Sequence, residues 1–280
     1  MADMGDGPVV DTFKVGIAQM SYDWTRHGSA EENLLKARDF TKRAARAKCR
    51  VVIFGEYFLG DVPVETLPNA QIIELQAQAK RSRINIVCGI TRNRISEQPR
   101  EQYLTSVVIG KRGEILSMVN KAVYNPTERP WFDKVDVVEP VEIDGVPCGI
   151  LAGYDSAVSK VPRLLAEKGA EVLLGQISVS SVEERETMQA AVITRANANS
   201  VPFAAVGQLG EFMKRQYLGG SIAVMPRTVK YGVMEVADGV DIMMRMEEEE
   251  DLGVVEFDLR ALRAMRKKFS HQELVPEGLS

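Results

Sequence analysis

The strongest constraint on the fold is a series of short apolar runs that alternate with segments of helical spacing. Residues 51–54 carry no polar alternation, and residues 146–152 form a second buried run. A strand without alternation is expected where both faces of a sheet are covered. Strands that alternate with helices along a chain are typical of an α/β domain. The sequence therefore predicts an α/β protein with a mixed sheet covered by helices.

The predicted elements cover most of the 280 residues without an obvious linker. Strands are expected at 13–20, 51–54, 84–90, 146–152, 171–174, 203–207 and 253–257, and helices at 31–48, around 72–79, and at 161–168, 183–199 and 259–268. Glycines at 110 and 113 predict a hairpin between 105–109 and 115–119. Residues 221–225 and 229–235 are expected to form a closing hairpin. We predict one domain at 12–268, a flexible tail at 1–11 and a C-terminal segment at 269–280.

Charge and hydropathy narrow the classes of function. The net charge is −4 and the pI is near 5.5, which argues against general nucleic-acid binding because that function needs a basic face. No apolar run approaches the length of a membrane span. The N-terminal residues are acidic and rich in glycine, unlike a signal peptide. We therefore expect neither a nucleic-acid partner nor a membrane partner.

The cysteines indicate a reducing compartment. Cys49, Cys88 and Cys148 are an odd number, they are widely spaced, and no pair has metal-ligand spacing. Cys88 and Cys148 lie in apolar runs and are interpreted as core thiols. We expect a cytoplasmic protein that has no metal site and no disulfide framework.

Three predicted strands end in residues that could carry chemistry. Glu56 follows the strand at 51–54, Lys121 follows the strand at 115–119, and Gly153-Tyr154-Asp155 follows the strand at 146–152. An acid at such a position can take a proton from a nucleophile, and an amine can stabilise an oxyanion. A structural ion pair between Glu56 and Lys121 is the simpler interpretation of the charges alone.

The order of several motifs resembles that of the carbon–nitrogen hydrolase superfamily, which contains nitrilases, aliphatic amidases and carbamoyl-amide hydrolases. The resemblance runs from about residue 15 to residue 258. It rests on these segments: Val15-Gly16-Ile17-Ala18-Gln19, Val51-Val52-Ile53-Phe54-Gly55-Glu56, Asn120-Lys121, Pro126-Thr127-Glu128-Arg129, Arg195-Ala196-Asn197-Ala198-Asn199, and Gly219-Gly220-Ser221 with Met225-Pro226. Gly55 replaces the proline of the family motif, and Ala198 replaces its glutamate.

The resemblance implies a fold and roles for individual residues. The expected architecture is a four-layer αββα sandwich. The family's general base falls on Glu56, its catalytic lysine on Lys121 and its assisting glutamate on Glu128. Tyr154 and Asp155 hold the register of the nucleophile motif and are assigned to substrate binding, although Asp155 could simply cap the helix that follows. Glu128 could instead pair with Arg129 or another surface base.

The departure from the family lies at the nucleophile. The family motif is roughly Ile-Cys-Tyr-Asp, and this chain has Ala152-Gly153-Tyr154-Asp155, so the cysteine position is Gly153. Glycine cannot form a thioester. Cys148 is expected on the opposite face of the strand and about 17 Å away, at roughly 3.4 Å per residue. Ser156 would need a different turn, and a water activated by Glu56 has no support from the family.

Three hypotheses remain open from the sequence. The first is a non-hydrolytic homologue, or pseudoenzyme, with a binding or regulatory role. The second is a hydrolase of a small amide, carbamoyl or nitrile substrate, in which Gly153 is an engineered or compensated replacement. The third is a repurposed enzyme that uses Glu56 and Lys121 as acid and base without a covalent intermediate.

Assembly and ligands also follow from the resemblance. The family implies a homo-oligomer, a dimer or larger, with residues 161–168 and 269–280 as candidate contacts. It implies a small amide-like ligand and neither a metal nor an organic cofactor.

Overall fold

The computed structural model describes residues 9–22, 29–59, 67–94, 101–133, 135, 137–212 and 214–268. The helices are α1 (Ser29–Arg46), α2 (Ala70–Ser82), α3 (Lys160–Glu167), α4 (Val182–Asn199), α5 (Leu259–Lys268) and the 3-10 turn η1 (Gly153–Ser156). The strands are β1 (Thr12–Gln19), β2 (Val51–Ile53), β3 (Asn85–Arg94), β4 (Glu101–Ile109), β5 (Ile115–Asn120), β6 (Val141–Ile143), β7 (Val146–Ala152), β8 (Val172–Ile177), β9 (Phe203–Gly207), β10 (Leu209–Phe212), β11 (Arg215–Leu218), β12 (Ile222–Pro226), β13 (Val229–Tyr231), β14 (Met234–Val236), β15 (Val240–Arg245) and β16 (Asp251–Asp258).

Two six-stranded sheets form the centre of the molecule. The first has the order β16-β1-β2-β3-β4-β5 and the second has the order β15-β12-β9-β8-β7-β6. In each sheet three neighbouring strands are parallel, β1, β2 and β3 in the first and β7, β8 and β9 in the second. Antiparallel strands flank both parallel sets. Because parallel strands end at the same edge, each sheet presents a group of strand ends at one edge.

The inner faces of the sheets share one apolar core. Phe13, Val15 and Ile17 of β1 lie in it, as do Cys148 and Ile150 of β7. Side chains at alternate positions leave a strand on opposite faces, so the neighbouring residues of each strand contribute to the outer layers. The core between the sheets therefore accounts for the lack of polar alternation in the central strands.

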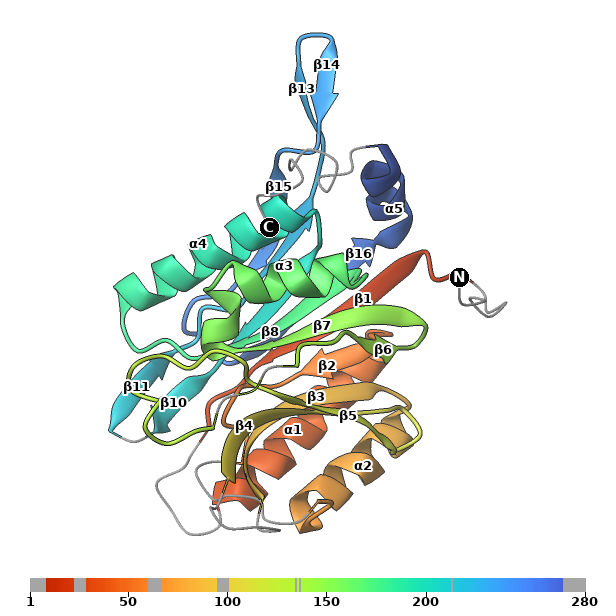
Figure 1. The fold of residues 1–280 in the computed structure, drawn as a ribbon. Coiled ribbons are helices and arrows are strands. Elements are labelled where there is room, and N and C mark those ends of the chain that lie inside the picture. Colours follow the sequence, from red (N-terminus) through yellow and green to blue (C-terminus); the bar gives the residue numbers. More distant parts are fainter. Residues whose placement is uncertain are drawn as a thin grey trace.

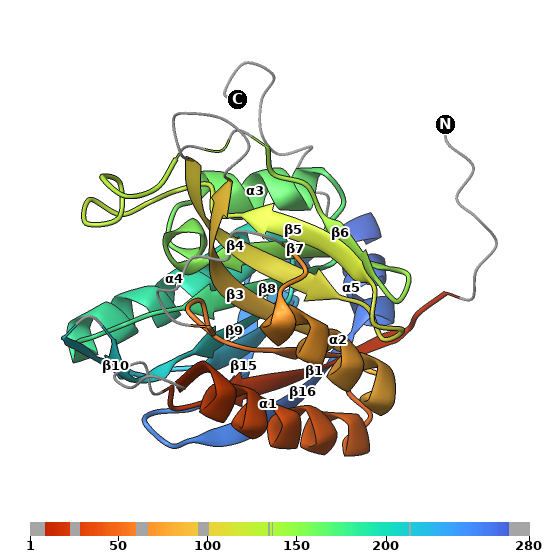
Figure 2. The same cartoon turned by 90° about the horizontal axis from the view of Figure 1, so that it is seen from below.

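Helices cover the two outer faces. On the first sheet, α1 and α2 contribute Phe40, Ala44 and Leu75 to a second apolar cluster. On the second sheet, α3 and α4 contribute Leu165 and Val192 to a third cluster. The two helix pairs lie on opposite sides of the stacked sheets (Figures 1 and 2). The order of layers is helix, sheet, sheet, helix, which confirms the expected αββα sandwich.

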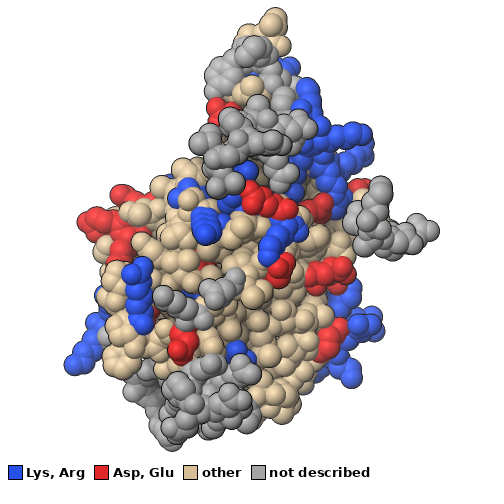
Figure 3. Space-filling model, in the orientation of Figure 1, with Lys and Arg blue, Asp and Glu red and all other residues tan. Residues whose placement is uncertain are grey.

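The helix α5 closes one end of the sandwich. Its apolar residues Leu259, Leu262 and Met265 enter the core between the sheets. Its basic side chains contribute to the gathering of Lys and Arg in the upper right of Figure 3. Two of them also bind the body, because Arg263 pairs with Glu171 and Arg266 donates to the carbonyl oxygen of Ser200. The basic helix therefore packs as an amphipathic element of the domain.

The predicted closing hairpin is wrong in its pairing. The strand β12 pairs with β15, in the register Ile222 to Arg245, and not with residues 229–235. Residues 229–231 and 234–236 pair with each other as β13 and β14, around Gly232, whose φ is +63°. This small hairpin projects from the body (Figure 1). A two-residue turn that includes glycine lets β13 and β14 form hydrogen bonds with each other. The edge of β12 is therefore available to pair with β15.

The remaining boundaries need smaller adjustments. Short strands β6, β10 and β11 were not expected, and β3 extends to Arg94. The expected tail, apart from residues 9–11, and the C-terminal segment 269–280 lie outside the described residues. None of the described helices combines the length and apolar character that a membrane crossing requires.

Candidate functional site

Four chain segments from both sheets meet at one edge of the sandwich. Glu56 follows β2 and Lys121 follows β5, both in the first sheet. Gly153 follows β7 and Ser178 follows β8, both in the second sheet. The fold thus brings together the three strand ends that the sequence singled out, and it adds a fourth.

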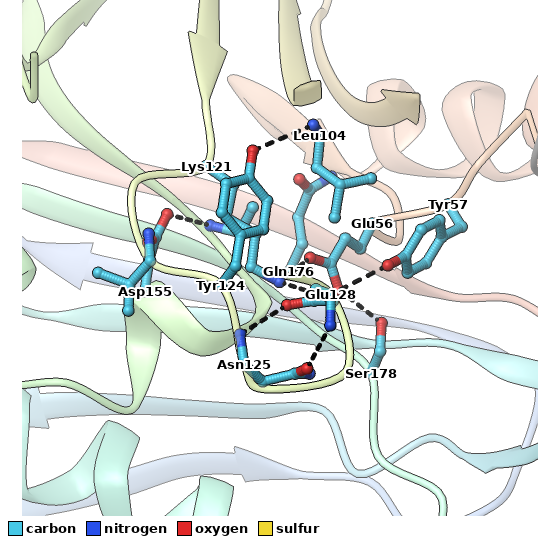
Figure 4. Close-up of polar contacts among 12 residues, drawn as sticks. Glu56, Tyr57, Leu104, Lys121, Tyr124, Asn125, Glu128, Asp155, Gln176 and Ser178 are labelled. Carbon is cyan, nitrogen blue, oxygen red and sulfur yellow. Dashed lines mark hydrogen bonds and ion pairs between the residues drawn. The ribbon is translucent and has the colours of Figure 1, made fainter. Parts of the chain in front are cut away.

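Lys121 is the centre of a cluster of three charged side chains. Its Nζ lies 2.7 Å from Glu56 Oε1 and 2.7 Å from Glu128 Oε1 (Figure 4). The side chains of Lys121 and Glu56 are 1% and 2% exposed, and that of Glu128 is 12% exposed. Glu128 therefore pairs with Lys121. The alternative interpretation, in which Glu128 pairs with a surface base, is wrong. A buried ammonium is stable here because two carboxylates satisfy it.

The charges of the three groups are linked. Burial raises the pKa of Glu56, the Lys121 ammonium opposes that shift, and the Glu128 carboxylate adds to it. Burial also acts to lower the pKa of Lys121, but the two carboxylates more than offset this and the pKa is raised. Lys121 is therefore held as an ammonium, and Glu56 takes up a proton more readily than an exposed carboxyl group.

The backbone around Glu56 is fixed by buried polar groups. Gln176 Nε2 donates to the carbonyl oxygens of Phe54 and Gly55, and Ser106 Oγ donates to Gln176 Oε1. The hydroxyl of Tyr22 accepts from the backbone N–H of Gly55. The carboxylate itself is held from a second side, because Ser178 Oγ donates to Glu56 Oε2 at 2.9 Å.

A tight turn positions Glu128. Asn125 Oδ1 accepts from the backbone N–H groups of Thr127 and Glu128, and the N–H of Asn125 donates to Glu128 Oε2. The hydroxyl of Tyr57 donates to Glu128 Oε1 at 3.2 Å. Burial raises the pKa of Tyr57 well above its usual value, so the phenol stays neutral and remains a donor.

Gly153 lies next to the charged cluster. Its φ is +47°, in the left-handed region that favours glycine. A Cβ on this residue would lie 2.5 Å from Lys121 Nζ and 2.6 Å from Glu56 Oε1. The ends of the two charged side chains therefore fill the space that a side chain at position 153 would need.

Asp155 ties the turn at Gly153 to the segment after Lys121. Its carboxylate accepts from the backbone N–H groups of Ala122 and Val123, and more weakly from that of Ala152. It is 3% exposed, and burial raises its pKa to about 7. These contacts occupy the carboxylate with protein groups, whereas Tyr154 is 39% exposed. A role of either residue in substrate binding stays a prediction.

The alternative nucleophiles considered from the sequence lie away from the cluster or within packed core. Cys148 lies in the core between the sheets, as expected, and is fully buried. Ser156 is also fully buried, and its Oγ lies near the α-carbon of Gly175, 3.2 Å from where a Cβ of that glycine would be. Burial raises the pKa of the Cys148 thiol well above its usual value, which disfavours the reactive thiolate.

Sequence reasoning missed several residues of the site. Ser178 bonds to Glu56, Tyr57 bonds to Glu128, and Gln176 bonds to the backbone of Phe54 and Gly55, just before Glu56. Gln176 had a detectable signal, because a polar residue inside the apolar run at 172–177 needs a buried partner. Tyr57, Tyr124 and Tyr217 form an aromatic wall with Leu104 beside the cluster, and this wall depends on long-range packing.

The described residues provide no metal site. Among the parts of the chain that the structure describes, no three His, Cys, Asp or Glu side chains lie close enough together to hold a metal ion.

The fold occurs in solved proteins of the nitrilase superfamily. A carbon–nitrogen hydrolase from Helicobacter pylori G27 has a TM-score of 0.80 at 16% identity, over 96% of this chain and 97% of that one. A variant, with cysteine replaced by alanine, of the amidase from Nesterenkonia AN1 has a TM-score of 0.73 at 20% identity, over 97% of this chain and 100% of that one. At these identities the likeness concerns the fold.

The sequence itself places the chain in a family. The family model for carbon–nitrogen hydrolases matches residues 14–267, so the chain belongs to the carbon–nitrogen hydrolase family. An (R)-stereoselective amidase from Pseudomonas sp is 28% identical over 171 residues, which are 60% of this chain. The matched part spans 57% of the length of that amidase.

Proposed function

We propose that this carbon–nitrogen hydrolase family member binds a small amide-type ligand without hydrolysing it. The observation that carries the proposal is the position of Lys121 Nζ and Glu56 Oε1, within 2.6 Å of where a Cβ of residue 153 would be. The family mechanism needs a thiol there, and Gly153 offers neither the thiol nor free space for one. The chain is therefore a pseudoenzyme with respect to the thioester route.

The ligand class follows from the relatives and from the charges. A variant of the Nesterenkonia amidase has been solved in complex with acrylamide. In this chain, two carboxylates and one ammonium leave no surplus of positive charge at Lys121. A neutral amide, which offers both donors and an acceptor, suits such a site better than a carboxylate, which Glu56 and Glu128 would repel. A binding or regulatory role in the cytoplasm is the corresponding cellular function.

Binding and turnover can be separated in one series of measurements. We expect calorimetry to detect binding of small primary amides to the wild-type protein, and an ammonia assay to detect no release above buffer. The Glu128→Gln variant, which alters the most accessible carboxylate of the cluster, is expected to bind more weakly. The proposal would be contradicted if the wild-type protein released ammonia and the Lys121→Met variant did not.

Hydrolysis remains the second candidate because the charged set is intact. Glu56, Lys121 and Glu128 retain mutual distances suited to a general base and an electrostatic stabiliser. What this candidate lacks is a reacting side chain at the turn, and it therefore depends on another nucleophile. The repurposed acid–base enzyme would need the same two groups and has no further observation in its favour.

A further inference from the structure

Ser178 occupies a distinctive place beside the vacant nucleophile position. It is the first residue after β8, and β8 runs parallel to β7 in the register Ala152 to Gln176. Gly153 and Ser178 therefore follow neighbouring strands at the same edge of the second sheet. Ser178 is partly exposed, whereas Gly153, Ser156 and Cys148 are buried.

The hydroxyl of Ser178 is hydrogen-bonded to an oriented base. Ser178 Oγ donates to Glu56 Oε2 at 2.9 Å, and Lys121 Nζ donates to the other oxygen, Glu56 Oε1, at 2.7 Å (Figure 4). A hydroxyl that meets a base, which in turn is held by a third group, is the arrangement by which enzymes activate serine. Burial, which raises the pKa of Glu56, makes that carboxylate a better proton acceptor near neutral pH.

We propose that Ser178 Oγ is a nucleophile of this site that accepts an acyl group from activated esters. Ser178 Oγ attacks the carbonyl carbon of an aryl ester and its proton passes to Glu56 Oε2. The new bond is between Oγ and the acyl carbon, the bond between the acyl carbon and the aryl oxygen breaks, and the phenolate leaves with the electron pair. The product is an ester on Ser178.

The leaving group sets the limit of this reactivity. A phenolate departs without protonation, whereas the nitrogen of an amide must be protonated as it leaves. Lys121 Nζ, the ammonium of the cluster, already donates to Glu56 and Glu128. With an amide, the proton that Glu56 Oε2 has taken from Ser178 must be passed on to the leaving nitrogen, a step that an aryl ester does not need. Acylation by activated esters therefore demands less of the site than amide hydrolysis does, and it extends the reactivity of the site beyond the proposed binding function.

The test uses p-nitrophenyl acetate and the 280-residue chain. We expect a burst of one p-nitrophenolate per chain, and peptide mass spectrometry is expected to place an acetyl group on Ser178. The Ser178→Ala variant should lose the burst by at least about 10²-fold. Ser180→Ala is the matched control, because Ser180 lies on the same loop but bonds to the exposed Glu184. It should react like the wild-type protein.

Several outcomes would overturn the proposal. The first is that the acetyl group is found on Lys121, a tyrosine or a surface lysine and not on Ser178. The second is a burst from Ser178→Ala equal to that of the wild-type protein. If Ser178→Ala does not fold, the mass spectrum of the acetylated wild-type protein decides alone. Ammonia release from amides would contradict the proposed function but not the ester on Ser178, so the two failures are distinguishable.

Discussion

At the scale of single residues, the balance of charge around Lys121 determines the stability of the site. The ammonium is shared by two carboxylates, and all three groups are at least largely buried. Loss of the ammonium leaves Glu56 and Glu128 without a counter-charge in a region of low polarity. Loss of one carboxylate leaves the ammonium with the other. The two kinds of substitution should therefore differ in cost.

This asymmetry is measurable by urea denaturation. We expect Lys121→Met to lower the free energy of unfolding by about 3–5 kcal/mol, the cost of breaking a buried pair. Glu56→Gln should cost clearly less, because Lys121 keeps Glu128. The cost of Lys121→Met should also shrink at acid pH, where a carboxylate takes up a proton. Equal losses for the two variants would contradict the description of the cluster.

Asp155 gives a second prediction at this scale, concerning pH. Its pKa is raised from 3.8 to about 7, so between these values the folded state binds more protons than the unfolded state. The contribution of this group to the free energy of unfolding therefore falls as pH rises from about 4 to 7, by on the order of 1 kcal/mol per pH unit. The Asp155→Asn variant lacks this pH-dependent contribution, because its side chain does not titrate.

The comparison of wild type and variant isolates the contribution of Asp155 to the free energy of unfolding. Relative to the wild-type protein, Asp155→Asn should become steadily more stable as pH rises from 5 to 7.5 in thermal or urea unfolding. Its hydrogen bonds to Ala122 and Val123 can persist through the amide oxygen. A stability difference that does not change over this range would show that Asp155 is ionised throughout.

At the scale of elements, the loop that carries Glu56 depends on two glycines with different surroundings. A Cβ on Gly89 of β3 would lie 1.9 Å from the backbone oxygen of Glu56, and neither backbone can yield easily. The atoms nearest to a Cβ on Gly55 would be in the side chains of Tyr22 and Gln208, at 3.0 and 3.1 Å. The close approach of β3 to this loop is therefore what requires glycine at position 89.

A pair of alanine substitutions tests this packing. Gly89→Ala should lower the free energy of unfolding by about 1–3 kcal/mol or more, as overpacking does, because the Glu56 backbone must move. Gly55→Ala, at the neighbouring position, should be tolerated better. Both can be compared by chemical denaturation. A smaller loss for Gly89→Ala than for Gly55→Ala would contradict the described contact.

The elements also show how far the sequence could predict the structure. Buried runs such as 146–152 and 203–207 coincide with β7 and β9. A strand that is buried on both faces is apolar throughout, so the sequence alone reveals it. The strand β15 was not predicted, because most of its residues are exposed and show no apolar alternation. Its pairing with β12 also requires the chain between them, residues 227–239, to project from the body as a separate hairpin. Glu56 and Lys121 were singled out as charged residues at strand ends, and the resemblance added Glu128 and assigned a role to each of the three. Ser178 was not, since only the fold places it against Glu56.

At the scale of the whole molecule, we predict assembly into a homodimer or a larger homo-oligomer. The candidate contacts are α3, which follows the turn at Gly153, and residues 269–280, which lie outside the described part of the chain. Tyr154 and Val182 are large exposed side chains near the ends of η1 and α4. Sedimentation equilibrium should give at least twice the mass of the 31.0 kDa chain. A monomer at micromolar concentration would contradict this prediction.

We propose that Gly153 withholds amide hydrolysis from a site that is otherwise intact. Gly153→Cys supplies a thiol, and it requires the side-chain ends of Lys121 and Glu56 to shift, because they lie 2.5 and 2.6 Å from where its Cβ would be. Gly153→Ala has the same backbone strain and the same Cβ but no thiol, so it is the matched control.

The most direct measurement is ammonia release from a panel of small primary amides by these three proteins. The predicted result is release by the folded Gly153→Cys protein alone, with a thioester detectable by mass spectrometry. Release by the wild-type protein at a rate similar to that of Gly153→Cys would contradict the claim, as would a folded Gly153→Cys protein that binds amides and releases no ammonia.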